Sequence, residues 1–236
     1  MTPAPRDLFL CLDTSTPTAR VAMLGGDGAL LFASEATADR HSGHVMALCA
    51  AALEAGGLTP AELAGIACGG GPGSFTGLRV GLAAAKGLAL PTGVPLFVVS
   101  SLEALALDIL DGRADGTIAV PCLDAGKGEV YAAAYVPDET RLVRELVPSV
   151  RLAPQDLKAW LLGLPEGAAL AGNGLERHRA ALAGGRFEEA IAVGPTAVSV
   201  GRLALLQRAR GEAADLATAV PFYGRPPDIT VKRQPG

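Results

Sequence analysis

The sequence predicts an α/β protein in which one supersecondary plan occurs twice, each time as a mixed β-sheet flanked by helices. Apolar runs of strand length alternate with segments of helical periodicity along most of the 236 residues. Each half begins with three strands joined by short turns and continues with strands that alternate with helices. An apolar strand also ends in an aspartate in each half, at Asp13 and at Asp124. Internal repetition of this kind is stronger evidence than any single motif.

The first half is expected to run β-β-β-α-β-α-β-α. A hairpin turn at Gly25-Gly26-Asp27-Gly28 joins its second and third strands, because glycine and Asp-Gly tolerate positive φ. The first helix follows His41-Ser42-Gly43-His44 and stops at Gly56-Gly57. The expected strands are Leu8–Leu12, Ala19–Leu24, Ala29–Ala36, Gly65–Cys68 and Val94–Val99, and the expected helices end near Ala55, run from Thr76 to Leu90, and run from a cap at Ser100 or Ser101 to Ile109.

The second half repeats this order after a polar segment, Asp-Gly-Arg-Ala-Asp-Gly at residues 111–116, which predicts a linker. The chain is therefore divided into an N-terminal subdomain, 1–110, and a degenerate C-terminal subdomain, 111–236. The expected strands are Thr117–Leu123, Glu129–Val136, Arg141–Val150, Ala168–Ala171 and Ala190–Val193, and the expected helices are Pro154–Leu162, Leu175–Ala183 and Ala197–Arg210.

Composition indicates a compact protein that does not bind nucleic acid by itself. Half of the residues are hydrophobic and 19% are charged, which is ample material for a core. Aromatic residues make up 4% and the formal net charge is −4, so this chain alone is poorly suited to stack bases or grip a phosphate backbone. No apolar run reaches the roughly 20 residues of a membrane helix, and the N-terminus lacks a signal core. We expect a cytoplasmic protein.

Histidine and cysteine positions predict neither a metal site nor a nucleophile. The four cysteines, Cys11, Cys49, Cys68 and Cys122, lie in separate apolar runs without a CxxC pair, which is typical of buried thiols. His41 and His44 are three residues apart at a helix start, but no acidic third ligand follows them at helical spacing. We expect no bound metal and no catalytic residue.

A glycine-rich loop between an apolar strand and a helix is the most informative segment of the chain. It reads Cys-Gly-Gly-Gly-Pro-Gly-Ser-Phe-Thr-Gly-Leu-Arg-Val-Gly over residues 68–81. Its spacing fits neither the P-loop, nor the dinucleotide-binding pattern, nor the serine-hydrolase elbow. Ser74 or Thr76 is expected to cap the helix. Such a loop can present backbone N–H groups to an anion or let a neighbouring segment pack closely, and the motif leaves both alternatives open.

The duplicated plan with an acidic strand end in each half resembles the ribonuclease H-like fold of the actin-like ATPase (ASKHA) superfamily. Within the first 135 residues, several segments are similar to the TsaB family, formerly called YeaZ, and the glycine loop is the most specific of them. The others are Leu12–Thr16, His41-Ser42, Lys86–Ala89, Ser100–Leu105 and Asp124–Tyr131. The second half matches weakly apart from Pro221-Phe222-Tyr223-Gly224-Arg225, where the family usually has a leucine between tyrosine and arginine.

The resemblance implies a non-catalytic subunit in the synthesis of N6-threonylcarbamoyladenosine in tRNA. In that family the paralogue TsaD carries the metal and is the transferase. The subunit of this type dimerises with TsaD and activates it, and the ATPase TsaE joins them. We also expect a homodimer when TsaD is absent, because a surface that fits a paralogue can fit a copy of itself. Contact with tRNA is expected only through the complex. The alternative is an ATP-dependent small-molecule kinase or carbamoyl transferase of the same superfamily.

The superfamily resemblance also indicates where a nucleotide would bind. An actin-like ATPase needs phosphate loops from both halves and a carboxylate for Mg²⁺. The candidates are Asp13, Thr14 and Ser15 in the first half and Asp124 and Gly126 in the second. The other interpretation of both aspartates is a turn residue that accepts hydrogen bonds from local N–H groups. We expect no resident cofactor, and ATP or ADP at the subunit junction is the open alternative.

The first two helices have more small and apolar residues than one buried side requires. Small residues four apart flatten a helix and let another backbone approach. Two such helices favour a helix-on-helix contact with TsaD, hypothetically a four-helix bundle, and ordinary packing inside the domain is the alternative. The predicted interface residues are His44, Val45, Leu48, Ala52, Gly77, Leu78, Gly81, Leu82 and Ala85.

Overall fold

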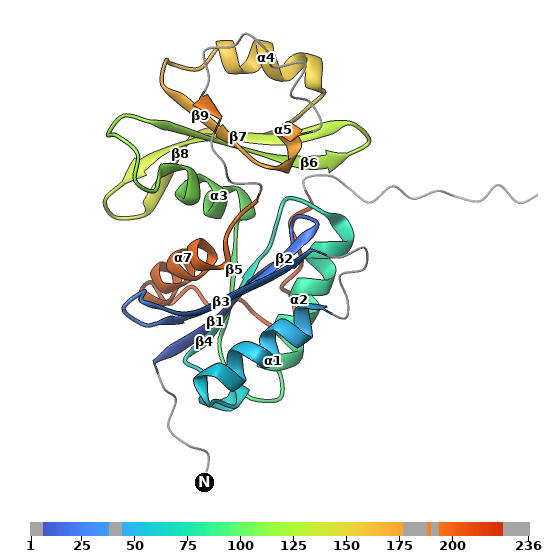
Figure 1. The fold of residues 1–236 in the computed structure, drawn as a ribbon, viewed down its shortest axis with the longest axis vertical. Helices are drawn as coiled ribbons and strands as arrows, with labels where there is room; N and C mark the ends of the chain where they lie inside the picture. Colours follow the sequence, from blue (N-terminus) through green and yellow to red (C-terminus); the bar gives the residue numbers. More distant parts are fainter. Residues whose placement is uncertain (1–6, 38–43, 177–187, 190–193, 224–236) are drawn as a thin grey trace, which may run out of the picture.

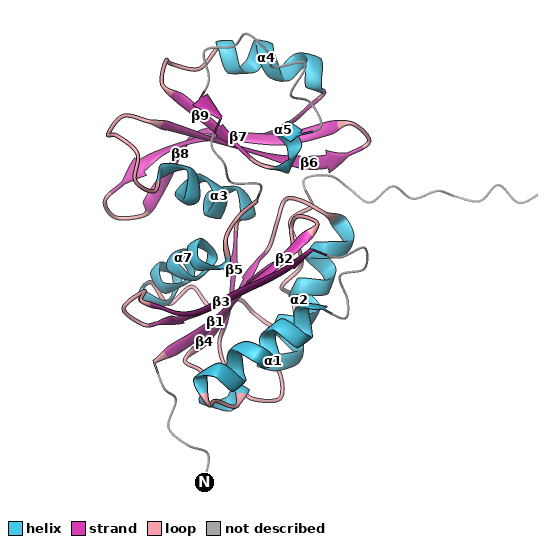
Figure 2. Cartoon of the chain, viewed as in Figure 1, coloured by secondary structure: helices cyan, strands magenta, loops and turns pink. Residues whose placement is uncertain are grey.

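A computed structural model describes residues 7–37, 44–176, 188–189 and 194–223. In the first half the elements are β1 (Leu8–Asp13), β2 (Thr18–Gly25), β3 (Leu30–Thr37), α1 (His44–Gly56), a 3₁₀ turn (Pro60–Glu62), β4 (Gly65–Gly69), α2 (Phe75–Ala89), β5 (Leu96–Val99) and α3 (Ser101–Leu110). In the second half they are β6 (Ile118–Gly126), β7 (Glu129–Asp138), β8 (Leu142–Leu152), α4 (Pro154–Leu162), β9 (Ala168–Ala171), α5 (Asn173–Glu176), β10 (Glu188–Glu189) and α7 (Ala197–Ala209). Figure 2 shows helices and strands alternating after the three opening strands of each half.

The two halves form separate five-stranded sheets with the same strand order. The first sheet runs β3-β2-β1-β4-β5 and the second runs β10-β9-β6-β7-β8, which is the same order read from the other edge. In each sheet the three opening strands pair antiparallel, and the later strands add parallel to the first of the three. The predicted duplicated α/β architecture with mixed sheets is therefore confirmed.

Helices cover both sheets, and two of them, α3 and α7, pack against the sheet of the other half. Helices α1 and α2 cover one face of the first sheet, while α4 and α5 lie on the far face of the second (Figure 1). Helix α3 follows the first sheet in sequence but packs against β6 and β7, whereas α7 comes from the second half and packs against β1, β2, β4 and β5. The division after residue 110 remains a prediction, since each half takes a covering helix from the other.

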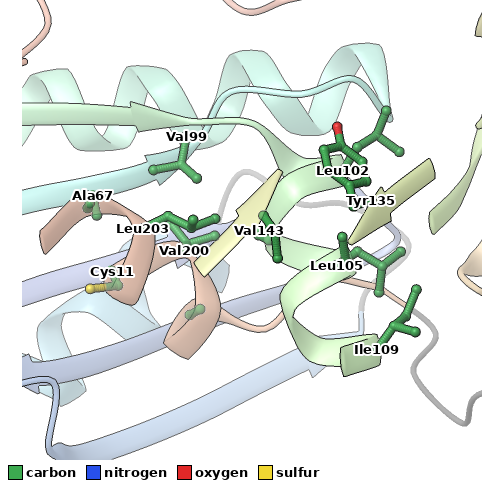
Figure 3. Close-up of a cluster of buried hydrophobic side chains, with 14 of the residues drawn as sticks. Cys11, Ala67, Val99, Leu102, Leu105, Ile109, Tyr135, Val143, Val200 and Leu203 are labelled. Atoms are coloured by element: carbon green, nitrogen blue, oxygen red, sulfur yellow. The ribbon is translucent and has the colours of Figure 1, made fainter. Parts of the chain in front are cut away.

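A hydrophobic core lies between the two sheets, around α3 and α7. Figure 3 shows Leu102, Leu105 and Ile109 of α3 close to Tyr135 and Val143 of the second sheet, with Val200 and Leu203 of α7 nearby. All of these side chains are buried. A carboxylate also joins the two helices, because Asp108 of α3 accepts hydrogen bonds from the hydroxyl groups of Thr196 (2.7 Å) and Ser199 (2.5 Å) at the start of α7.

Most predicted element bounds agree with the structure to within two residues. The exception is the end of β6, which continues to Gly126 rather than stopping at Leu123, and the structure has a short strand β10 at Glu188–Glu189. The predicted strand at 190–193 and most of the helix predicted to end at Ala183 lie outside the described residues. Across the described ranges, none of the helices combines the length and apolar character that crossing a membrane requires.

Candidate functional site

Asp13, at the end of β1, is a buried structural carboxylate. It is fully buried, and it accepts hydrogen bonds from the backbone N–H of Ser15 (2.9 Å), the hydroxyl of Ser15 (2.7 Å) and the hydroxyl of Ser101 (3.1 Å). Burial raises the pKa of the Asp13 carboxyl above its usual range, and these hydrogen bonds oppose that shift. Asp13 therefore joins the end of β1 to the start of α3.

The glycine loop closes over the residues that follow Asp13. The Thr14 hydroxyl donates to the carbonyl of Gly77 (2.8 Å), and the Ser74 N–H donates to the carbonyl of Ser15 (2.7 Å). A Cβ atom at Gly77 would collide with the backbone carbonyl of Thr14, so α2 approaches this closely only because it carries glycine there. Of the two alternatives left by the sequence, the loop here is a close-packing surface. Ser74 is the cap, since its hydroxyl accepts from the Gly77 N–H at 3.2 Å.

The phosphate-binding interpretation of Asp13, Thr14 and Ser15 stays a prediction, and the structure shows these residues closed. All three side chains are buried: Asp13 and Thr14 are hydrogen-bonded to Ser101 and Gly77, and the Ser15 hydroxyl donates to Asp13. A phosphate would need these groups to be solvent-accessible and unpaired. The turn interpretation left open by the sequence fits Asp13 better.

Asp124 and Gly126 occupy the corresponding place in the second half and are only partly buried. The Asp124 carboxylate accepts the N–H of Gly126 (2.8 Å), and the backbone N–H of Asp124 donates to the side-chain oxygen of Asn173 (3.1 Å). Gly126 has a φ of +72°, in the left-handed region that glycine tolerates. This carboxylate therefore holds a local turn between β6 and β7, as the turn interpretation predicts.

The predicted interface residues lie mainly on the wrong side of their helices. Val45, Ala52, Leu78, Leu82 and Ala85 are at most 4% exposed and pack within the chain. The glycines at 77 and 81 are buried against Thr14. Leu48 is half-buried, and only His44 of the predicted set is exposed. The buried members form the side by which α1 and α2 pack onto the first sheet, which leaves His44 and part of Leu48 accessible to a partner.

The opposite side of the two helices is exposed, and its central residues are uncharged, with Glu54 and Arg79 at its edges. We define the outer face as Met46, Ala47, Ala50 and Ala51 of α1 with Val80, Ala83, Gly87 and Leu90 of α2. All are exposed except Val80, which is half-buried, and Leu90 is 72% exposed. The two helices lie side by side on the first sheet (Figure 1), so the outer face is shared between them. Such a surface is typical of a helix-on-helix contact with another chain.

The segment Pro221–Tyr223 runs from the end of the fold back over the glycine loop. The N–H of Phe222 donates to the carbonyl of Gly70 (2.8 Å), and the hydroxyl of Tyr131 on β7 donates to the carbonyl of Tyr223 (2.6 Å). The side chain of Tyr223 reaches α2, where its hydroxyl accepts from Arg79 Nε at 2.9 Å. This segment therefore joins α2 to the second sheet. Gly224 and Arg225 lie outside the described residues.

The four cysteines are buried, and burial raises the pKa of the thiols of Cys49 and Cys122 to about 12. None of them is a thiolate at neutral pH. His44 is at the start of α1, and His41 lies outside the described residues. In the part of the chain that the structure describes, no group of three or more histidine, cysteine or acidic side chains is arranged to hold a metal ion.

Comparison with known proteins agrees with this architecture. The family model of TsaD, tRNA N6-adenosine threonylcarbamoyltransferase, matches residues 32–220. The chain is 33% identical over 158 residues to TsaB, a tRNA threonylcarbamoyladenosine biosynthesis protein, of Bacillus subtilis, covering 67% of this chain and 66% of that protein. It is 36% identical to TsaB of Escherichia coli, covering 56% of each. These matches thus span less than two thirds of either relative.

A solved structure of YeaZ from Pseudomonas aeruginosa aligns with a TM-score of 0.77 and 25% identity, covering 91% of this chain and 100% of that one. An activator of 2-hydroxyisocaproyl-CoA dehydratase from Clostridium difficile shares the fold alone, with a TM-score of 0.52 and 9% identity. The chain is thus an α/β protein with the duplicated fold of the actin-like ATPase superfamily. It belongs to the TsaD family, and its relatives group it with the TsaB (YeaZ) members.

Proposed function

We infer that this chain is the accessory subunit of a threonylcarbamoyl-transfer complex acting on tRNA, and that it binds and activates a TsaD-type transferase. The observation that supports this function best is the outer face of α1 and α2, which is exposed and uncharged in a chain of the TsaD family. The chain is also 35% identical over 135 residues to a tRNA N6-adenosine threonylcarbamoyltransferase from Rhodopseudomonas palustris. A paralogue of this type would present helices of the same kind.

Burial of the outer face would supply the binding free energy. Apolar surface removed from water contributes about 25 cal/mol per Å², less the entropy lost on association. Alanine and glycine at 83 and 87 let a partner helix come close to the α2 backbone. The transferase would then keep its catalytic groups in the active arrangement because its own helices are held. A homodimer through the same face, a TsaE-type ATPase in the complex, tRNA contact only through the complex and a nucleotide at the subunit junction belong to the same proposal.

The rival function, an ATP-dependent kinase or carbamoyl transferase, needs an open phosphate site. The closure of residues 13–16 under the glycine loop disfavours it. The two functions differ in what the isolated chain does. A kinase binds Mg·ATP tightly and turns over alone, whereas an accessory subunit does neither and acts only with its partner.

The test is reconstitution with the TsaD-type transferase from the same organism. We expect the two chains to co-elute on size-exclusion chromatography and tRNA modification to require both. Ala83→Glu should abolish co-elution and modification, because it inserts a charge into the outer face. Ala159→Glu is the matched control, since Ala159 is exposed on α4. Modification at full rate without this chain would refute the function.

A further inference from the structure

Arg79 lies on the surface of α2 but is held in a fixed position. Its Nε donates to the hydroxyl of Tyr223 at 2.9 Å, and its guanidinium carbon lies 3.9 Å from the centre of the Phe75 ring and 5.5 Å from that of Tyr223. The two rings are themselves in contact, with centres 4.9 Å apart. Cation–π contacts and one hydrogen bond therefore fix the plane of the guanidinium.

Tyr223 is in turn fixed by the rest of the fold. Its carbonyl accepts the hydroxyl of Tyr131, and the neighbouring Phe222 is hydrogen-bonded to the glycine loop at Gly70. The rotamer of Arg79 is thus set by contacts from β7 and the glycine loop as well as from its own helix. An arginine fixed in this way loses little entropy when it binds an anion.

Among the residues that the structure describes, none binds the terminal amino groups of Arg79. Within the described ranges the Tyr223 hydroxyl is its only hydrogen-bond partner, and no carboxylate forms an ion pair with it. The four N–H donors of the two terminal nitrogens form a planar fork, which matches the two oxygens of a carboxylate approaching end-on. The guanidinium is therefore preorganised to bind one carboxylate.

The position of Arg79 indicates where that carboxylate comes from. Arg79 precedes Val80 and is one turn from Ala83, so it lies at the edge of the uncharged outer face, and Phe75 beside it is 45% exposed. A partner that covers this face removes Arg79 from water, and a desolvated cation without a counter-charge is strongly unfavourable. The formal net charge of −4 disfavours a nucleic-acid phosphate as the ligand.

We propose that Arg79 is the anchoring cation of the outer face and that it receives an aspartate or glutamate of the TsaD-type partner. This inference rests on the proposed function. It adds a specific polar contact to an otherwise apolar docking surface, which would fix the register of the partner helices.

The test is isothermal titration of the purified transferase with wild-type chain and variants at low and high salt. Arg79→Met should weaken binding on the order of 10- to 100-fold, as for an arginine hot spot. Arg79→Lys should lower the affinity about 10-fold, because lysine keeps the positive charge but lacks the planar guanidinium. Tyr223→Phe should lower the affinity only about 3-fold. It removes the hydroxyl that accepts from Arg79 Nε but keeps the aromatic ring beside the guanidinium. Arg202→Met, on the exposed side of α7, is the matched control and should bind like wild type.

Salt dependence separates an ion pair from a merely structural role. The affinity of the wild type should fall more steeply with salt than that of Arg79→Met, and thermal unfolding should show that each variant is folded. Wild-type affinity in Arg79→Met, or an affinity loss with an unchanged salt dependence, would overturn the proposal while the proposed function stands. A normal protein complex with weakened tRNA binding would assign Arg79 to a phosphate and overturn it too. Failure of the wild type to bind would instead refute the proposed function.

Discussion

The carboxylates that end the first strand of each half have equivalent places in the two sheets, yet their surroundings differ. Asp13 is fully buried with three hydrogen-bond donors around it, whereas Asp124 is only partly buried and holds a hairpin turn. In the first half the glycine loop closes over the strand end, and the helices α1 and α2 expose the uncharged outer face. The outer surface of α4 in the second half carries Gln155 and Asp156. One topology thus supports a closed strand end and an exposed apolar helix surface in the first half, and a partly open strand end in the second.

The largest expected effect is the loss of the buried carboxylate. Asp13→Ala leaves the N–H and hydroxyl of Ser15 and the hydroxyl of Ser101 without an acceptor, so we expect a loss of about 4 kcal/mol of unfolding free energy. Asp124→Ala removes the acceptor of the Gly126 N–H in a partly buried turn and should cost about 1 kcal/mol. Urea unfolding of both variants with a common m-value measures the difference. Equal losses would mean that the two strand ends do not differ as described.

The two sides of α2 should also respond differently. Leu82→Ala truncates a side chain that is 4% exposed and should cost about 3 kcal/mol of stability. Ala83→Glu, on the outer face, should change the unfolding free energy by less than about 0.5 kcal/mol, because the new side chain extends into water. Urea unfolding of the isolated chain tests both. A strongly destabilised Ala83→Glu variant would mean that the outer face is covered within the monomer.

The fold was largely predictable because its signals are local. Alternating apolar residues mark the strands, and glycines that tolerate positive φ mark the hairpins, so the repeated order of elements follows from the sequence. The closure around Asp13 was left open, because it depends on a contact between Thr14 and Gly77, which are 63 residues apart. The contact between Arg79 and Tyr223 could not be predicted either, because these residues are 144 positions apart in the sequence.

The interface residues predicted on α2 lie on its buried side, and sequence periodicity could not have shown this. Periodicity shows that Leu78 and Leu82 share one side of the helix, and that Ala83 and Leu90 share another. Both sides are apolar or small, so the pattern does not indicate which of them faces the chain's own sheet. Only the packing of the helix on β4, and of Gly81 against Thr14, decides it.

A smaller effect concerns pH. Burial raises the folded-state pKa of Asp13 above its unfolded value of 3.8, so its contribution to stability is fully present below 3.8 and is lost as the pH rises through the folded-state pKa. Between pH 3.8 and the folded-state pKa, the unfolding free energy of the wild type should fall by up to about 1.4 kcal/mol per pH unit relative to Asp13→Asn. The asparagine side chain does not titrate. Urea unfolding of both proteins between pH 4 and pH 8 provides the comparison. Parallel pH profiles would show that Asp13 does not titrate in this range.

The smallest expected effect concerns the hydrogen bond that joins the two halves through Tyr223. Tyr131→Phe removes the hydroxyl that donates to the Tyr223 carbonyl, which should cost about 1 kcal/mol and loosen the segment that crosses the glycine loop. Because Tyr223 also contacts Arg79, the variant should loosen α2 in the first half as well as β7 in the second. Amide hydrogen exchange should therefore speed up at Phe222, whose N–H is bonded to Gly70, and in the first turn of α2, but not in α4. Faster exchange at Phe222 alone would mean that the two halves are held together by the α3 and α7 core and not by this segment.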